Sequence, residues 1–183
     1  QSSQFCLHLQ PIEELAGKTI TLLGYGDLGQ ATARLAEAFG MKVIVAERPQ
    51  AKQIRPGRIA FESAIRSADV LSLHCPLTDE TAKLVNTQTL SWMKPSALLI
   101  NTARGGLIDE TALAEALVQG RIAGAALDVL STEPPPQHHP LLASTVPNLI
   151  ITPHVAWASQ QAMQRLVRQL AENLQAFLQQ KPI

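Results

Sequence analysis

The stretch that decides the fold reads Thr19-Ile20-Thr21-Leu22-Leu23-Gly24-Tyr25-Gly26-Asp27-Leu28-Gly29. It begins as a short apolar run that is typical of a buried strand, and this run stops at a glycine. From Leu28 to Phe39 the apolar residues recur at helical spacing, and Gly40 follows as a stop signal. The glycines form the pattern G-x-G-x-x-G between a strand and a helix, the context in which this pattern indicates a dinucleotide-binding loop.

Each glycine of this loop has its own expected role. Gly24 permits the tight turn, Gly26 lets a pyrophosphate approach the backbone, and Gly29 lets the helix pack closely on the strand. The N-terminus of the helix offers N–H groups and the positive end of its dipole to the phosphates. The alternative is a glycine-rich turn that binds nothing, but the regular flanking elements favour the ligand site.

An acidic residue follows the second expected strand. Glu47 can accept hydrogen bonds from the hydroxyls of an adenosine ribose and repel a 2′-phosphate, which favours NAD over NADP. The next loop contains Arg48, Lys52, Arg55 and Arg58. We interpret these cations as belonging to a solvated loop; the alternative is that Arg48 accepts a 2′-phosphate and admits NADP.

Strand and helix patterns alternate along the rest of the chain. Strands are expected at residues 19–23, 42–46, 70–73, 97–100, 123–129 and 149–151, and helices at 28–39, 62–68, 87–93, 109–118 and from 159 onwards. Asp109 and Ser159 are the expected N-caps of the last two helices. This order predicts an α/β fold of the Rossmann type, a doubly wound parallel sheet with helices on both faces. The strands are continuously apolar, which is typical of a sheet buried on both sides.

Composition limits the class of protein. The 183 residues correspond to about one domain, and 46% apolar against 16% charged residues suits a buried core rather than a disordered chain. The 15 basic and 15 acidic residues balance, so no general field attracts nucleic acid. No apolar run is long enough to cross a bilayer, and no signal-peptide pattern opens the chain. Cys6 and Cys75 fit reduced thiols, no Cys/His spacing fits a metal site, and we expect a cytoplasmic protein without nucleic-acid or membrane partners.

Three expected strand ends carry side chains with catalytic potential. Arg104 follows the strand at 97–100, Asp128 and Glu133 lie at the end of the next strand, and His154 follows the last strand. Because the carboxyl ends of parallel strands meet at one edge of a sheet, a cation, carboxylates and an imidazole are expected there together. Taken singly, each has a plainer interpretation: Arg104 could cap carbonyl groups, and His154 could be a packed loop histidine.

In these segments the chain resembles the cofactor-binding domain of the D-isomer-specific 2-hydroxyacid dehydrogenases. The resemblance rests on residues 22–30, 74–78 and 101–106, on Asp128 with Glu133-Pro134, and on Pro153-His154. It extends from about residue 15 to the C-terminal helix, and the order and spacing of the motifs agree throughout.

The resemblance implies hydride transfer between NAD(H) and a small 2-keto or 2-hydroxy acid. His154 would be the acid/base at the C2 oxygen, a task that suits the near-neutral pKa of imidazole. Glu133 would hold the other imidazole nitrogen, and the planar fork of Arg104 would bind the substrate carboxylate. The alternative, similar to the corepressor relatives of this family, is a non-catalytic NAD-binding regulatory or scaffold module.

The resemblance also implies which residues contact the cofactor, NAD with NADP as the alternative. These are Tyr25, Gly26, Asp27, Leu28, Glu47, Arg48, Cys75, Pro76, Thr81, Thr102, Ala103, Arg104, Asp128 and His154. Asp128 is similar to the family's acidic residue near the nicotinamide carboxamide. Trp157 lies three residues after His154, and this spacing resembles that of glycerate dehydrogenases (hydroxypyruvate reductases). The resemblance implies hydroxypyruvate or glyoxylate as the substrate. His138 and His139 are expected to serve structure.

The family's fold has two domains, and the resemblance assigns this chain to one of them. We expect residues 1–14 to be a terminal segment left from a preceding region. Residues 15–157 would form the NAD-binding domain, and 158–183 a helix that returns toward the N-terminal substrate domain, which is missing here. Relatives imply a homodimer. With half of the cleft absent, this chain is expected to bind NAD(H) but to have little activity alone.

Overall fold

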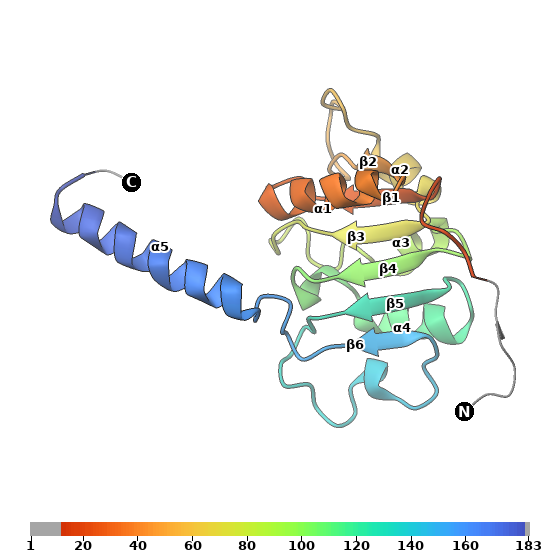
Figure 1. Ribbon diagram of the computed structural model, residues 1–183. Helices are drawn as coiled ribbons and strands as arrows, with labels where there is room; N and C mark the ends of the chain where they lie inside the picture. The colour runs from red at the N-terminus through yellow and green to blue at the C-terminus, as the bar shows by residue number, and fades with distance from the viewer. Residues whose placement is uncertain (1–11, 182–183) are drawn as a thin grey trace, which may run out of the picture.

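A parallel sheet forms the centre of the computed structural model, which describes residues 12–181 (Figure 1). Its strands are β1 (Thr19–Leu23), β2 (Lys42–Val45), β3 (Val70–Leu73), β4 (Leu98–Asn101), β5 (Gly124–Leu127) and β6 (Leu149–Ile151). They lie in the order β2-β1-β3-β4-β5-β6, and every neighbouring pair is parallel. The predicted Rossmann-type sheet is confirmed, with strand bounds that differ by no more than about two residues.

The helices follow the strands as the sequence predicted. They are α1 (Asp27–Ala38), α2 (Phe61–Ser67), α3 (Thr87–Trp92), α4 (Glu110–Val118) and α5 (Gln160–Leu178). Asp109 caps α4 by accepting a hydrogen bond from the N–H of Ala112 at 3.3 Å, and Ser159 caps α5 by accepting one from Ala162 at 3.1 Å. Two 3₁₀ turns, Gly105–Leu107 and Pro140–Leu142, were not predicted because single turns carry no apolar period.

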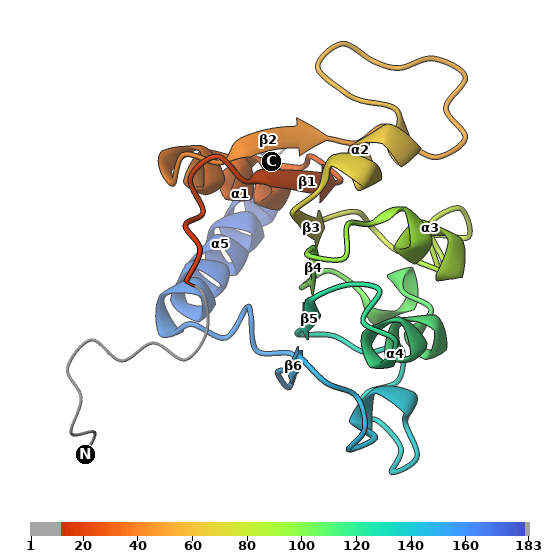
Figure 2. The same ribbon diagram turned by 90° about the vertical axis from the view of Figure 1, so that its right-hand side faces the viewer.

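Apolar side chains pack on both faces of β1. Ile20 and Leu22 point to α1 and pack with Ala33, Ala36 and Met41. The larger part of the core lies on the opposite face, between the sheet and helices α2, α3 and α4. Figure 2 shows this arrangement edge-on, with α1 on one side of the sheet and α2, α3 and α4 on the other.

The expectation of a sheet buried on both sides holds for only part of it. The strand register puts Leu98 of β4 and Ile150 of β6 on the same face as Ile20 of β1. Helix α1 covers this face at β1 and β2, but Leu98 is 45% exposed and Ile150 is 66% exposed, so residues 12–181 cover the face only in part at β4 and β6. The continuous apolar character of β4 and β6 therefore exceeds what the described residues bury.

Helix α5 projects away from the sheet after β6, on the same side as α1 (Figures 1 and 2). All its residues are described, and none of them is buried. No helix between residues 12 and 181 has both the length and the apolar character of a membrane span. Cys75 is a free, half-buried thiol; Cys6 and residues 1–11 of the expected terminal segment lie outside the described residues.

Candidate active site

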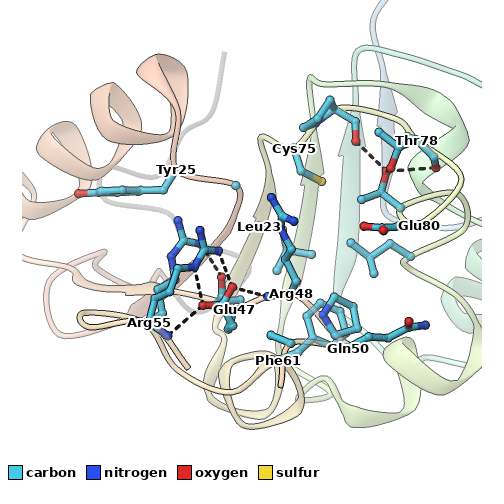
Figure 3. Close-up of a pocket in the computed structure, with 18 of the residues that line it drawn as sticks. Leu23, Tyr25, Glu47, Arg48, Gln50, Arg55, Phe61, Cys75, Thr78 and Glu80 are labelled. Atoms are coloured by element: carbon cyan, nitrogen blue, oxygen red, sulfur yellow. Dashed lines mark hydrogen bonds and ion pairs between the residues drawn. The ribbon is translucent and has the colours of Figure 1, made fainter. Parts of the chain in front are cut away.

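A cavity of about 890 Å³ opens at the carboxyl ends of β1, β2 and β3 (Figure 3). Seven of the predicted cofactor contacts line it: Tyr25, Gly26, Glu47, Arg48, Cys75, Pro76 and Thr81. Asp27 and Leu28 do not line it; they begin α1 next to the glycine loop and are exposed. Three loops that are far apart in sequence thus enclose one space at the edge where α/β sheets bind ligands.

Two glycines of the first loop are required for different reasons. Gly24 has a φ of +100°, and a Cβ there would lie 2.5 Å from the carbonyl carbon of His74, so the protein's own packing requires glycine. At Gly26 a Cβ would meet no atom within 4 Å, and φ is −79°. Gly26 is also the N-cap residue of α1. The room left at Gly26, at the N-terminus of a helix, fits a phosphate group that approaches the backbone.

Glu47 lies at the end of β2 with its side chain paired. The guanidinium of Arg55 donates from Nε to Oε2 at 2.8 Å, and Nη2 pairs with Oε1. The backbone N–H groups of Arg48 and Arg55 donate to the same carboxylate at 2.9 and 3.1 Å. The hydrogen bonds from Arg55 come first among the causes that hold the pKa of Glu47 well below its ordinary value, against the opposing effect of burial. The sequence alone identifies Arg55 only as one of four cations in this loop and does not indicate that it pairs with Glu47.

The loop after β3 forms the opposite wall of the cavity. The hydroxyl of Thr81 donates to the carbonyl of Pro76 at 2.7 Å and accepts from the N–H of Thr78 at 2.8 Å, so Thr81 shapes this loop. Burial raises the pKa of the Cys75 thiol, which therefore stays neutral at the cavity wall. Thr78 and Glu80 also line the cavity, although neither was among the predicted contacts.

The second part of the candidate site follows β4. Buried Asn101 holds the turn after this strand: its side chain accepts from the N–H of Ala103 and donates to the carbonyl of Arg104, both at 2.9 Å. Thr102 and Arg104 are exposed on this turn. A Cβ on Gly105 would lie 1.9 Å from the carbonyl carbon of Leu130, so glycine lets the Arg104 turn pack against the chain that leaves β5.

Beyond β5 and β6 the structure brings Glu133 and His154 together. Nδ1 of His154 lies 2.7 Å from Oε2 of Glu133, and Oε1 of Glu133 accepts from the N–H of Leu130 at 2.8 Å. The hydrogen bond with His154, then the one from Leu130, lowers the pKa of Glu133. An ionised carboxylate only accepts, so Nδ1 carries the proton and Nε2 is the nitrogen left to face a ligand. Both side chains are partly exposed, His154 by 43%.

Asp128 fixes the backbone of the histidine loop. It is 5% exposed, and it accepts hydrogen bonds from the N–H groups of Val155 and Ala156, both at 2.9 Å, and from the hydroxyl of Thr152 at 2.5 Å. Burial favours the neutral acid, but these hydrogen bonds outweigh it and the pKa of Asp128 lies below its ordinary value. His154 has a φ of +55°, a conformation that costs free energy and is maintained here by these contacts. This role of Asp128 was not foreseen from the sequence.

A buried histidine, His139, holds the proline-rich loop. Nε2 of His139 lies 3.1 Å from Oε2 of Glu110, whose carboxylate also accepts from the backbone N–H of Ser131 at 2.7 Å and pairs with its hydroxyl. His139 is 5% exposed, and its Nδ1 accepts from the N–H of Leu141. These contacts agree with the structural role expected for His139, and they fix the chain two residues before Glu133. The contribution of Glu110 was missed, because a side chain at the start of a helix gives no sign of a distant partner.

Strand register explains why these side chains share one edge. Asn101, Leu127 and Ile151 are register partners in β4, β5 and β6, and the chain segments with Arg104, Glu133 and His154 follow directly. Trp157 stays beside the histidine: its indole N–H donates to the carbonyl of His154 at 2.8 Å, while the side chain is 59% exposed. One sheet edge therefore carries the cavity at β1–β3 and the arginine, glutamate and histidine at β4–β6.

Comparison with known proteins gives consistent matches. The profile described as D-isomer specific 2-hydroxyacid dehydrogenase, NAD binding domain, matches residues 4–156. Glycerate dehydrogenase of Methylorubrum extorquens is 48% identical over 183 residues, which are 100% of this chain and 57% of that protein.

Solved structures show the same partial coverage. The acyclic imino acid reductase Bsp5, in complex with NADPH and D-Arg, has a TM-score of 0.82 and 38% identity, covering 96% of this chain and 57% of its own. A D-isomer specific 2-hydroxyacid dehydrogenase from Lactobacillus delbrueckii ssp. bulgaricus, in its NAD complexed form, has a TM-score of 0.80 and 30% identity, covering 93% of this chain and 56% of its own. The chain thus spans little more than half the length of these relatives.

Proposed function

This chain belongs to the D-isomer specific 2-hydroxyacid dehydrogenase family and corresponds to its NAD-binding domain, and we propose that it transfers a hydride between NAD(H) and a small 2-keto or D-2-hydroxy acid. The observation that carries this proposal is the pair of His154 and Glu133, 2.7 Å apart, at the sheet edge that also presents Arg104. The oriented imidazole favours an enzyme over a module that only binds NAD, and turnover distinguishes the two.

When bound, NAD(H) supplies or accepts the hydride at the substrate's C2 carbon. His154 gives a proton from Nε2 to the C2 oxygen during reduction and takes one back during oxidation, a contribution of about 10²–10⁴-fold. Glu133 keeps the imidazole in the correct tautomer and stabilises its protonated form. Arg104 binds the substrate carboxylate through its planar fork and polarises the keto oxygen.

We propose hydroxypyruvate or glyoxylate as the keto acid, giving D-glycerate or glycolate. Relatives with glycerate dehydrogenase, hydroxypyruvate reductase and glyoxylate reductase activity in their names are 38–48% identical to this chain. Trp157 supports the choice, because its indole binds the carbonyl of His154 and leaves a large exposed side chain next to the catalytic position.

The remaining site assignments are also proposals. The predicted contacts of Thr102, Ala103, Arg104, Asp128 and His154 lie at the β4–β6 end of the edge, where the nicotinamide would have to reach the acid/base. Asp128 acts on the cofactor through the loop that it holds, since its carboxylate already accepts three hydrogen bonds.

We further propose that the substrate-facing half of the cleft lies outside these 183 residues, that α5 returns toward it, and that the protein is a cytoplasmic homodimer. On this view the 183 residues bind NADH but turn over little substrate, because residues 12–181 leave the side chain of His154 43% exposed to water. Substantial turnover by the 183 residues would contradict this part of the proposal, and sedimentation of the intact protein as a monomer would contradict the homodimer.

The experiment is NADH oxidation by the intact protein that carries this chain, with hydroxypyruvate, glyoxylate and pyruvate as separate substrates. We expect turnover that is fastest with hydroxypyruvate or glyoxylate. Tight NADH binding without turnover of any small 2-keto acid would overturn the proposed enzymatic function. The non-catalytic regulatory module would then be the function.

His154→Ala tests the role of the imidazole. We expect kcat to fall by at least about 10²-fold while the Kd for NADH stays within about twofold of wild type, because the side chain acts on the substrate oxygen. If NADH affinity collapses together with turnover, His154 is a structural residue rather than the acid/base.

A further inference from the structure

The carboxylate at the end of β2 has no acceptor capacity left. A carboxylate has about four acceptor positions, and Glu47 receives Nε and Nη2 of Arg55 and the backbone N–H groups of Arg48 and Arg55. Its side chain is 2% exposed, whereas that of Arg55 is 50% exposed. Glu47 can therefore reach the hydroxyls of an adenosine ribose only by giving up hydrogen bonds to Arg55.

The pairing also removes the charge by which Glu47 would repel a phosphate. Residues 48–58 contain four cations, Arg48, Lys52, Arg55 and Arg58, and no acid. Three of these cations line the cavity, whereas its acidic lining residues are Glu47 and Glu80. With Glu47 neutralised by Arg55, Arg48 and Arg58 are in excess on this wall, and Figure 3 shows Glu80 across the cavity from it.

The two cations in excess differ in their availability. Arg58 donates from Nη1 to the carbonyl of Ala46 at 3.1 Å, which fixes it against the strand end. Arg48 is exposed, directly follows Glu47, and lies on the cavity wall. A guanidinium in this position can bind a phosphate through two N–H groups.

We propose that the Glu47–Arg55 pair turns this cavity into a site that accepts a 2′-phosphorylated adenosine ribose, so that the protein binds NADP(H) at least as tightly as NAD(H). Arg48 contacts the 2′-phosphate, and Arg55 determines specificity by keeping Glu47 occupied. The inference rests on the proposed dinucleotide site, and it reverses the preference for NAD that an acidic residue after the second strand indicates from sequence alone.

Calorimetric titration of the 183-residue chain with NAD⁺, NADP⁺, AMP and 2′,5′-ADP tests the proposal without any need for turnover. The last two ligands differ only by the 2′-phosphate and report on the adenosine end alone. We expect NADP⁺ to bind no more weakly than NAD⁺, and 2′,5′-ADP more tightly than AMP. A preference for NAD⁺ of about tenfold or more would overturn the proposal, whereas binding of neither dinucleotide would overturn the proposed function instead.

Variants separate the two arginines. Arg48→Ala should weaken NADP⁺ and 2′,5′-ADP by about tenfold and leave NAD⁺ and AMP within about twofold. Arg55→Ala should weaken the 2′-phosphorylated ligands at least as much and leave or tighten NAD⁺, because Glu47 then faces the ribose with its charge exposed. Lys52→Ala, in the same loop but not on the cavity wall, is the matched control and should change none of the affinities.

A double variant distinguishes this role from simple support of the loop. Glu47→Gln combined with Arg55→Ala should restore NADP⁺ affinity toward wild type, since no charge remains to repel the phosphate. Equal weakening of NAD⁺ and NADP⁺ in Arg55→Ala, without recovery in the double variant, would overturn the proposal. Because Arg48 is an exposed side chain, Arg48→Ala remains a valid test even if the loss of Arg55 unfolds the loop.

Discussion

At Gly26 the protein has room for a side chain and carries none. Its φ of −79° is open to any L-residue, and a Cβ would meet no atom within 4 Å. Gly24, two residues earlier, lies against the backbone of His74 and has a φ of +100°, so the fold itself demands glycine there. The difference assigns Gly26 to the ligand and Gly24 to the fold.

Gly26→Ala should therefore separate binding from stability. We expect the free energy of unfolding to change by less than about 1 kcal/mol, because alanine fits the backbone conformation without strain. NADH affinity should fall by about tenfold or more, because the methyl group occupies the space of the pyrophosphate. Urea denaturation and NADH fluorescence titration measure the two quantities.

Gly105→Ala provides the contrast, because its Cβ would lie 1.9 Å from the carbonyl carbon of Leu130. This variant should lose several kcal/mol of stability, on the order of what overpacking costs. A Gly26→Ala protein that binds NADH as tightly as wild type would show that the open space is not a phosphate site.

The sequence predicted which candidate side chains lie together at one sheet edge, but it did not predict which partner each side chain binds. Arg104, Glu133 and His154 could be picked out because they follow strand ends. The partner of Glu47 could not be, because Arg55 is eight residues away in a loop without periodicity. Likewise, nothing in the sequence around Asp128 indicates that its carboxylate binds backbone N–H groups beyond the next strand.

Among the elements, the N-terminal edge of the sheet depends on one carboxylate. Asp69, just before β3, accepts from the N–H of Thr19 in β1 and from Nζ of Lys94, each at 2.7 Å. Burial opposes ionisation of Asp69, but the hydrogen bonds from Lys94 and Thr19 outweigh it, so its pKa lies below the ordinary value. The ionised form thus connects β1, β3 and the segment that leads into β4.

Asp69→Asn should lower the free energy of unfolding by about 1–2 kcal/mol at neutral pH. A carboxyl whose pKa is lower in the folded than in the unfolded protein stabilises above the unfolded value, about 3.9, and the contribution is lost as pH falls through the folded value. The difference between wild type and Asp69→Asn should therefore shrink between about pH 4 and more acidic conditions. Urea denaturation at a series of pH values measures it.

The exposed pair of Glu62 and Arg66 on α2 is the control, since Glu62→Gln should change stability by less than about 0.5 kcal/mol. An Asp69→Asn difference that stays constant from neutral to acidic pH would contradict the ionic role assigned to this carboxylate.

The bounds of the helices and strands could be predicted closely, because apolar periodicity and helix caps depend on residues that are close together in the sequence. Glycines at positions 40 and 120 have positive φ values, as helix-ending residues should, and both follow their helices closely. What local signals missed were contacts between elements, such as the carboxylate of Glu110 on α4 accepting from the N–H of Ser131 and lying beside the imidazole of His139. These depend on how the chain returns to itself, which no window of sequence records.

For the molecule as a whole, α5 is the helix that contributes no buried residue to the described fold. None of its residues is buried, although Leu166, Leu170 and Phe177 repeat an apolar face that is 64–74% exposed. Together with the uncovered part of the sheet at Leu98 and Ile150, this face is apolar surface beyond what residues 12–181 bury. Such surface is typical of interaction sites.

Removal of residues 158–183 should therefore leave the domain intact. We expect the free energy of unfolding at low protein concentration to change by less than about 1 kcal/mol, because burial of apolar area drives stability and α5 buries none within the domain. Urea denaturation of residues 1–157 beside the full chain measures this. A loss of several kcal/mol would mean that α5 packs on the domain in solution.

The central claim is that His154 protonates a substrate while NADH reduces it, and isotope transfer tests this most directly. The intact protein is incubated with hydroxypyruvate and with NADH that carries deuterium on the transferable position of the nicotinamide, beside the His154→Ala variant. We predict D-glycerate with deuterium on C2 from wild type, and at least about 10²-fold less from the variant. If wild type binds the labelled NADH but transfers no deuterium to C2 of any small 2-keto acid, the account is contradicted.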